Sequence, residues 1–96
     1  MEGESRLISR QWVTASALLA EKECELLFAY LVPSAANASV TLYDGENTTG
    51  DLIATLKEAA VSGHEFTPPV PIYCRKGLYV DVGSNVTGVL VMWRLL

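Results

Sequence analysis

The sequence is poor in the residues from which most enzymes and metal sites are built. It has one histidine, His64, and two cysteines, Cys24 and Cys74, among 96 residues. The CxxC and HxxxH spacings of zinc sites do not occur. The GxSxG elbow, the Walker loop and the dinucleotide GxGxxG are also missing. These absences predict a protein that is not an enzyme and that uses no metal and no other cofactor.

Charge is also scarce, and its sign excludes further classes. Only 19% of residues are charged, the net charge is -4, and half of the residues are hydrophobic. Nucleic-acid binding needs clustered Lys and Arg, and a disordered acidic tail needs few apolar residues. The longest apolar run, residues 86–96, contains Arg94 and is shorter than the ~18 residues of a membrane span. Residues 1–10 lack the apolar core of a signal peptide, so we expect neither secretion by that route nor a membrane partner.

The chain is small for so apolar a composition. Its mass of 10.4 kDa predicts a folded surface of ~5,400 Å² and the burial of ~5,800 Å² of apolar area. At ~25 cal/mol per Å² this burial gives ~145 kcal/mol, and ordering the chain costs about the same. The mean hydropathy of +0.26 is high for a monomer. We therefore expect one domain that gains stability from a partner.

Alternating residues separated by turn residues predict about seven or eight short strands in residues 11–96. Such spacing is typical of an all-β protein, an antiparallel β-sandwich of jelly-roll or Ig-like type. Residues 1–10 are polar, and we expect a flexible N-terminal arm. Residues 11–20 are mixed, because Trp12 and Val13 favour a strand whereas the following Ala and Leu favour a helix. The predicted strands beyond them cover residues 24–32, 39–43, 52–56 with 52–58 as the longer alternative, 64–67, 72–74, 78–82 and 86–94.

Several polar groups resemble sites, but simpler interpretations are favoured. His64 lies beside Gly63 and Glu65 and is expected in a solvated loop. The two cysteines are expected as small buried hydrophobes, with one disulfide as the alternative. An acidic turn departs from the order of an EF-hand, although an irregular calcium site stays open. Three Asn-x-Ser/Thr triplets are interpreted as turns. The acidic turn contains Asp44, Glu46 and Asp51, and the triplets begin at Asn37, Asn47 and Asn85.

The last strand is apolar on both faces, whereas a sandwich strand normally buries one. Leu90 and Met92 fall on one face, and Val89, Val91 and Trp93 fall on the other. Trp and Met are enriched in interfaces, so we favour a subunit contact over cover by the N-terminal arm. The predicted interface residues are Arg6, Arg10, Trp12, Leu90, Met92 and Trp93.

Four segments within residues 24–94 resemble small virion proteins of tailed bacteriophages. They read PSAANASVTLYDG at 33–45, TGDLIATL at 49–56, PVPI at 69–72 and GLYVDV at 77–82. The resemblance implies a β-sandwich that is a structural part of the virion, and within that class a capsid decoration, or cement, protein. Such proteins are small oligomers, often homotrimers, that bind the major capsid protein at the capsid surface after assembly in the host cytoplasm. The matched pattern contains no ligand residues.

Three other functions are kept as alternatives. A neck, tail or fibre component belongs to the same virion class. A carbohydrate- or receptor-binding module needs exposed aromatics near carboxylates. Tyr43, Tyr73 and Tyr79 are candidates, although alternation predicts that they lie on alternating strand faces. A small enzyme or inhibitor has no motif in its support.

Overall fold

The structure is a computed structural model, and it describes residues 7–96. Those residues form nine strands joined by turns, so the predicted all-β class is confirmed. The strands are β1 (Ile8–Val13), β2 (Ala17–Ala20), β3 (Cys24–Pro33), β4 (Ala38–Asp44), β5 (Asp51–Glu58), β6 (His64–Phe66), β7 (Ile72–Cys74), β8 (Leu78–Val82) and β9 (Val86–Leu95).

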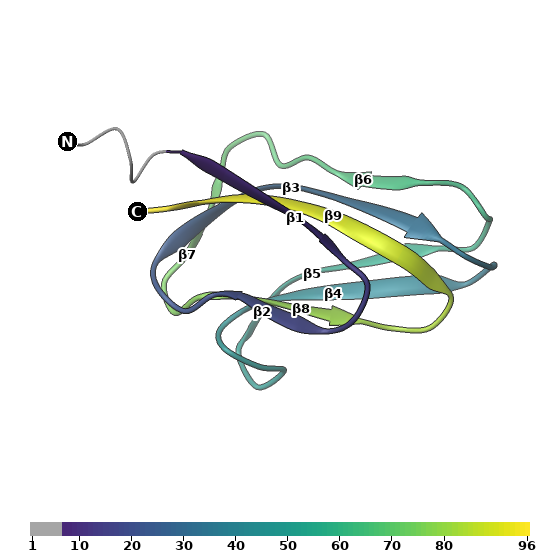
Figure 1. The fold of residues 1–96 in the computed structure, drawn as a ribbon, viewed down its shortest axis with the longest axis horizontal. Helices are drawn as coiled ribbons and strands as arrows, with labels where there is room; N and C mark the ends of the chain where they lie inside the picture. The colour runs from purple at the N-terminus through teal and green to yellow at the C-terminus, as the bar shows by residue number, and fades with distance from the viewer. Residues whose placement is uncertain (1–6) are drawn as a thin grey trace.

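The strands form two antiparallel sheets that pack face to face (Figure 1). The first sheet has the order β1-β9-β3-β6, with β7 also pairing with β3, and the second has the order β2-β8-β4-β5. Chain connections therefore pass repeatedly from one sheet to the other, which is the winding of a jelly roll. The C-terminus and the beginning of β1 lie at the same end of the sandwich (Figure 1). Among residues 7–96 there is no helix with the length and hydropathy of a membrane span.

The core lies between the sheets and is filled by the inward residues of the long strands. Leu26 and Leu31 of β3, Leu42 of β4, Leu78 of β8 and Val91 of β9 are fully buried. No polar or charged side chain among the described residues is buried in this core. Burial of aliphatic side chains from both sheets is therefore the main stabilising contribution to the fold.

One irregularity in β3 changes which residues face outward. The pairing of β3 with β9 matches Leu26 with Trp93 and then Phe28 with Met92, so Leu27 is an extra residue. A β-bulge of this kind shifts the alternation by one residue. Strict alternation along the predicted strand 24–32 would put Cys24, Leu26 and Phe28 on a single face, and the bulge breaks that alternation. Cys24 and Leu26 face the core, whereas Phe28 and the alternate residues after it face outward.

The N-terminal part of the domain differs from its prediction. Residues 8–10 belong to β1 and not to an arm, because they pair with β9 from Ile8 opposite Arg94 onward. Residues 17–20 form β2 and not a helix, because they pair with β8. The part of the predicted arm that precedes residue 7 lies outside the described residues. Sheet pairing thus overrides the local helix propensity of Ala and Leu.

Two asparagines form the turns that the sequence predicted. Asn37 and Asn85 have positive φ values of 65° and 62°, a conformation that asparagine tolerates better than most residues. The side-chain amide of Asn85 donates a hydrogen bond to the Ala36 carbonyl at 2.9 Å. The two turns therefore support each other at the end of the sandwich away from the C-terminus (Figure 1).

Candidate functional site: the outer face of the first sheet

The outer face of the first sheet carries large apolar side chains in register across three strands. In one row Arg10 of β1 lies beside Met92 of β9, which lies beside Phe28 of β3. In the next row Trp12 lies beside Leu90, which lies beside Tyr30. All six side chains are exposed or half-buried. We call Trp12, Phe28, Tyr30, Val32, Leu90 and Met92 the outer face.

Trp12 is held on this face by the absence of a side chain beneath it. A Cβ atom on Gly88 would lie 2.2 Å from Cζ2 and 2.4 Å from Cε2 of the indole ring. Only glycine therefore leaves space for the ring to lie against the backbone of β9. The residue stays 48% exposed, so one side of the ring contacts the sheet and the other is open. Trp12 is thus fixed in place and accessible to a partner.

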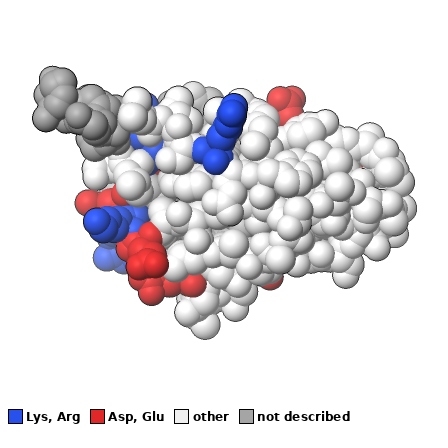
Figure 2. All heavy atoms as spheres, viewed as in Figure 1, with Lys and Arg blue, Asp and Glu red and all other residues white. Residues whose placement is uncertain are grey.

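The row of the outer surface nearest the C-terminus contains an ion pair. Arg94 of β9 donates to Oε1 of Glu25 from Nη2 at 2.6 Å and from Nε at 3.1 Å. Both side chains are only 25–30% exposed, so water screens the pair less than it screens a surface pair. In the view of Figure 2 most of the visible charged atoms gather toward this end, and the other half of the face shown carries few charges. The outer face is therefore apolar in the middle and charged at one end.

The outer face of the second sheet has a different character. Thr41 of β4 pairs with Asp81 of β8 and with Thr55 of β5, and the two threonine hydroxyls lie 3.5 Å apart. The Asp81 carboxylate also accepts a hydrogen bond from the Ser16 hydroxyl at 3.0 Å. Hydroxyls and a carboxylate suit contact with water. The next row of this face carries Leu18, Tyr79, Tyr43 and Leu52, so its large side chains form one row beside a polar one. On the first sheet they fill two adjacent rows.

Most of the predicted interface residues lie together on this outer face. Arg10, Trp12, Leu90 and Met92 occupy adjacent positions of β1 and β9. Trp93 does not belong with them, because it faces the core and is 7% exposed. Arg6 lies outside the described residues. The sequence prediction missed Phe28, Tyr30 and Val32, since the bulge at Leu27 is not visible in the alternation pattern.

Two tyrosines meet on the second sheet. Tyr43 of β4 is directly opposite Tyr79 of β8, with ring centroids 6.5 Å apart and an angle of 50° between the ring planes. The prediction that these tyrosines lie on alternating faces is therefore wrong for this pair. Tyr73 lies apart from them on β7, in the other sheet, where its hydroxyl donates to the Glu23 carboxylate. That hydrogen bond raises the pKa of Tyr73, because ionisation would remove the donated proton and leave two negative charges side by side.

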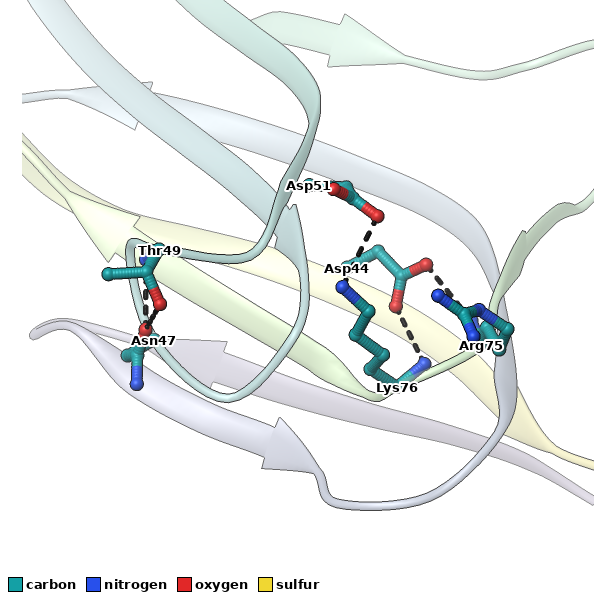
Figure 3. A network of polar contacts seen from close by, with 6 residues as sticks. All are labelled: Asp44, Asn47, Thr49, Asp51, Arg75 and Lys76. Atoms are coloured by element: carbon teal, nitrogen blue, oxygen red, sulfur yellow. Dashed lines mark hydrogen bonds and ion pairs between the residues drawn. The ribbon is translucent and has the colours of Figure 1, made fainter.

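The acidic turn is explained by contacts within the protein (Figure 3). The Asp44 carboxylate accepts hydrogen bonds from the backbone N–H groups of Arg75 at 3.0 Å and Lys76 at 2.8 Å. Nζ of Lys76 lies 3.5 Å from Oδ2 of Asp51. Asn47 accepts a hydrogen bond from the backbone of Thr49 at 2.8 Å, which confirms its predicted turn. Nowhere in residues 7–96 do three His, Cys, Asp or Glu side chains meet in a group able to hold a metal ion.

The cysteines and the histidine are placed by strand pairing. Cys24 of β3 is directly opposite Cys74 of β7, and both thiols are free and fully buried. A hydrogen bond between them lowers the pKa of Cys24 and raises the pKa of Cys74, which burial raises further. His64 begins β6 and is not in a loop, and its Nδ1 lies 3.1 Å from Oε1 of Glu58. These groups link strands inside the domain.

Comparison with known proteins identifies a fold and no family. No family model and no curated protein matches the chain. The core of the Drosophila NLP protein, studied for pentamer formation and histone binding, has a TM-score of 0.59 and 13% identity over 95% of this chain and 97% of its own. A Bacillus endospore appendage protein of disulfide-linked pili has a TM-score of 0.47 and 12% identity, covering 95% and 90% of the two chains. The family 32 carbohydrate-binding module of C. perfringens NanJ, solved with galactose, has a TM-score of 0.46 and 9% identity, covering 95% of each chain.

These similarities bear on architecture alone. The likeness to the NLP core extends over nearly the whole of both chains and is a likeness of fold. Identity this low carries no information about ligands or partners, because one fold serves many functions. The class of protein defined here is therefore a single jelly-roll sandwich with an apolar outer face.

Proposed function

We propose that the protein is a structural subunit of a tailed-phage virion, and that it acts as a capsid decoration protein at the capsid surface. The observation that carries the proposal is the outer face, where Trp12, Leu90 and Met92 stand in register and are only partly covered. Apolar residues of this size at an exposed sheet surface mark a contact with another protein. The resemblance of residues 24–94 to virion proteins supplies the identity of that protein, the major capsid protein.

The mechanism that we propose is mechanical. A subunit that binds the assembled shell and not its separated parts stabilises the shell by mass action. The outer face buries apolar area against the capsid, whereas the hydroxyl-bearing face of the second sheet remains toward the solvent. Several such contacts in one oligomer act together through effective concentration. The acidic net charge of -4 stays outside the apolar contact.

The thermal lifetime of capsid shells with and without the protein tests this function. Wild-type protein is added to shells that lack it, and the lifetime of the shells on heating is measured. We expect Leu90→Asp to lose both binding and protection, because a carboxylate would have to be buried in the contact. The matched control is Thr55→Asp on the second sheet, which should bind and protect as the wild type does. Equal shell lifetimes with and without wild-type protein would contradict the proposal.

A neck, tail or fibre component is the alternative within the virion. The same outer face would then join copies of this chain or other tail proteins. The mass of the isolated protein and the site of immunogold labelling on the virion distinguish these positions. Label distributed over the capsid supports decoration, whereas label at the neck or tail supports the alternative.

A carbohydrate-binding module is favoured by one specific observation, the Tyr43–Tyr79 pair. The pair lies in the second sheet beside the row that contains Thr41 and Asp81, so aromatic rings, a hydroxyl and a carboxylate are close together. Sugar binding predicts hits on a glycan array that Tyr79→Ala removes and Tyr73→Ala retains. An array without hits dismisses this function and leaves the virion role untouched.

A further inference from the structure

The four edges of the two sheets are protected to different degrees. Exposed edge strands pair with other chains unless they are short, bulged, charged or rich in proline. At one edge of the first sheet, β6 and β7 have three residues each and are separated by a segment that contains three prolines, Pro68, Pro69 and Pro71. At the edges of the second sheet, β2 has four residues and a register shift, and β5 has a register shift and charged residues at both ends.

The remaining edge, β1, has almost none of these protections. It has six residues, contains no proline, and pairs with β9 in an unbroken register. Arg10 is its only charged residue. Within residues 7–96 no strand pairs with its other side. β1 lies in front of β9 in the view of Figure 1.

The faces of β1 restrict how a second copy can pair with it. Ile8, Arg10 and Trp12 face outward, whereas Ser9, Gln11 and Val13 point to the inner side. In an antiparallel pair, opposite residues lie on the same face of the sheet. Two copies of β1 related by a two-fold axis must therefore be centred on a residue, and the overlap is longest for a centre at Arg10 or at Gln11.

Charge decides between these two registers. A centre at Arg10 would place the two guanidinium groups directly opposite each other, which is unfavourable. A centre at Gln11 places each Arg10 opposite Trp12 of the other copy, and a cation beside the open side of an indole ring is attracted to it. Trp12 is held against Gly88 and is 48% exposed, so it is available for this contact.

We infer that two copies of the chain pair through β1, antiparallel and centred on Gln11, with Arg10 of each copy against Trp12 of the other. The two first sheets then form one continuous sheet. Their outer faces lie side by side and make a platform of twice the width. This contact goes beyond the proposed function, because it concerns self-association in solution and requires no capsid.

Single cysteine substitutions test the register. At a centre on Gln11 the two copies of residue 11 are directly opposite, at a separation that a disulfide bridges. The two copies of residue 10 are then diagonal neighbours ~7–8 Å apart, beyond the reach of a disulfide. Gln11→Cys, Arg10→Cys and a control on β5, Lys57→Cys, are oxidised with glutathione disulfide, which is reduced to two thiols for each bond formed. The native cysteines are fully buried, and wild type gives their background.

We expect Gln11→Cys to form a covalent dimer at least about tenfold faster than Arg10→Cys or Lys57→Cys, since only that pair is within disulfide distance. Wild-type protein should show twice the 10.4 kDa chain mass in sedimentation equilibrium at high concentration. Faster crosslinking of Arg10→Cys would overturn the register. A wild-type protein that stays monomeric, or that forms a trimer as the phage resemblance implies, would overturn the pairing itself. Failure here leaves the shell-lifetime result unaffected, so the two proposals fail separately.

Discussion

Substitution of Gly88 by alanine should destabilise the protein through Trp12 alone. The new Cβ would lie 2.2 Å from the indole ring, so the ring must leave the surface of β9. A tryptophan buries up to ~250 Å², and Trp12 is 48% exposed, so the contact covers ~125 Å² and contributes ~3 kcal/mol. Replacing a glycine within a strand by alanine by itself stabilises the folded state by ~0.5–1 kcal/mol, which offsets part of this loss. We therefore expect a net loss of ~2 kcal/mol, or a fall of roughly 10 °C in Tm.

A double-mutant cycle separates this mechanism from general strain. Wild type, Gly88→Ala, Trp12→Ala and the double variant are unfolded in urea at one protein concentration, with far-ultraviolet circular dichroism as the common probe. Without the indole ring, Gly88→Ala should be neutral or stabilising by ~0.5–1 kcal/mol. The coupling free energy is then ~3 kcal/mol. An equal cost of Gly88→Ala in both backgrounds would exclude a clash with Trp12 as the cause, because the penalty would then come from the backbone of β9.

Three further predictions concern the core, the acidic turn and one tyrosine. Leu42→Ala should lower the free energy of unfolding by ~3–5 kcal/mol, because Leu42 is fully buried. Its control, Leu52→Ala at a 63% exposed site, should lower it by less than ~0.5 kcal/mol. Equal losses in urea unfolding would contradict the assignment of Leu42 to the core. Asp44→Ala should lower the free energy of unfolding by ~1–3 kcal/mol, because two backbone N–H groups lose their acceptor. Asp51→Ala removes only an exposed ion pair and should lower it by at most ~1 kcal/mol. Because the pKa of Tyr73 is raised above its ordinary 10.0, the contact with Glu23 stabilises the fold below that pH and is lost as the pH rises through the folded pKa. Glu23→Gln should lower the pKa of Tyr73 in an absorbance titration corrected with Tyr73→Phe, and an unchanged titration would exclude the Glu23 contact.

The strands from residue 24 onward could be predicted from the sequence because turn chemistry and alternation agree there. Asn37 and Asn85 mark turns, and the residues between such turns alternate with period two. The predicted strands at 72–74 and 78–82 match β7 and β8 at both ends. Local signals and tertiary pairing point to the same structure in this part of the chain, as they do in most well-folded sequences.

The first two strands could not be predicted, because their partners are distant in the sequence. β1 pairs with β9 at the other end of the chain, and β2 pairs with β8. Their own residues carry weak or opposing propensities, and Ala17–Ala20 favours a helix by composition. These residues become strands because they form hydrogen bonds with the edges of β9 and β8. A local sequence pattern does not reveal such long-range pairing.

The candidate site was predicted in part for a similar reason. The two-sided apolar character of the last strand put Leu90, Met92 and Trp93 among the predicted interface residues, and in the structure only Leu90 and Met92 of these three lie on the outer face. Phe28 and Tyr30 were missed as their neighbours because one extra residue, Leu27, reverses the alternation in β3. A bulge leaves no signal in hydropathy, since it depends on how the partner strand is matched.

The function proposed for this protein requires that the outer face of the first sheet be covered by another protein in the assembled particle. Hydroxyl-radical footprinting with mass spectrometry measures this directly, by comparing side-chain oxidation in the free protein and in the virion. We expect Met92 and Trp12 to be oxidised in the free protein and protected in the virion, whereas Tyr43 and Tyr79 on the second sheet should be oxidised equally in both. Equal oxidation of Met92 and Trp12 in the two states, or protection of the tyrosine pair instead, would contradict the proposed function.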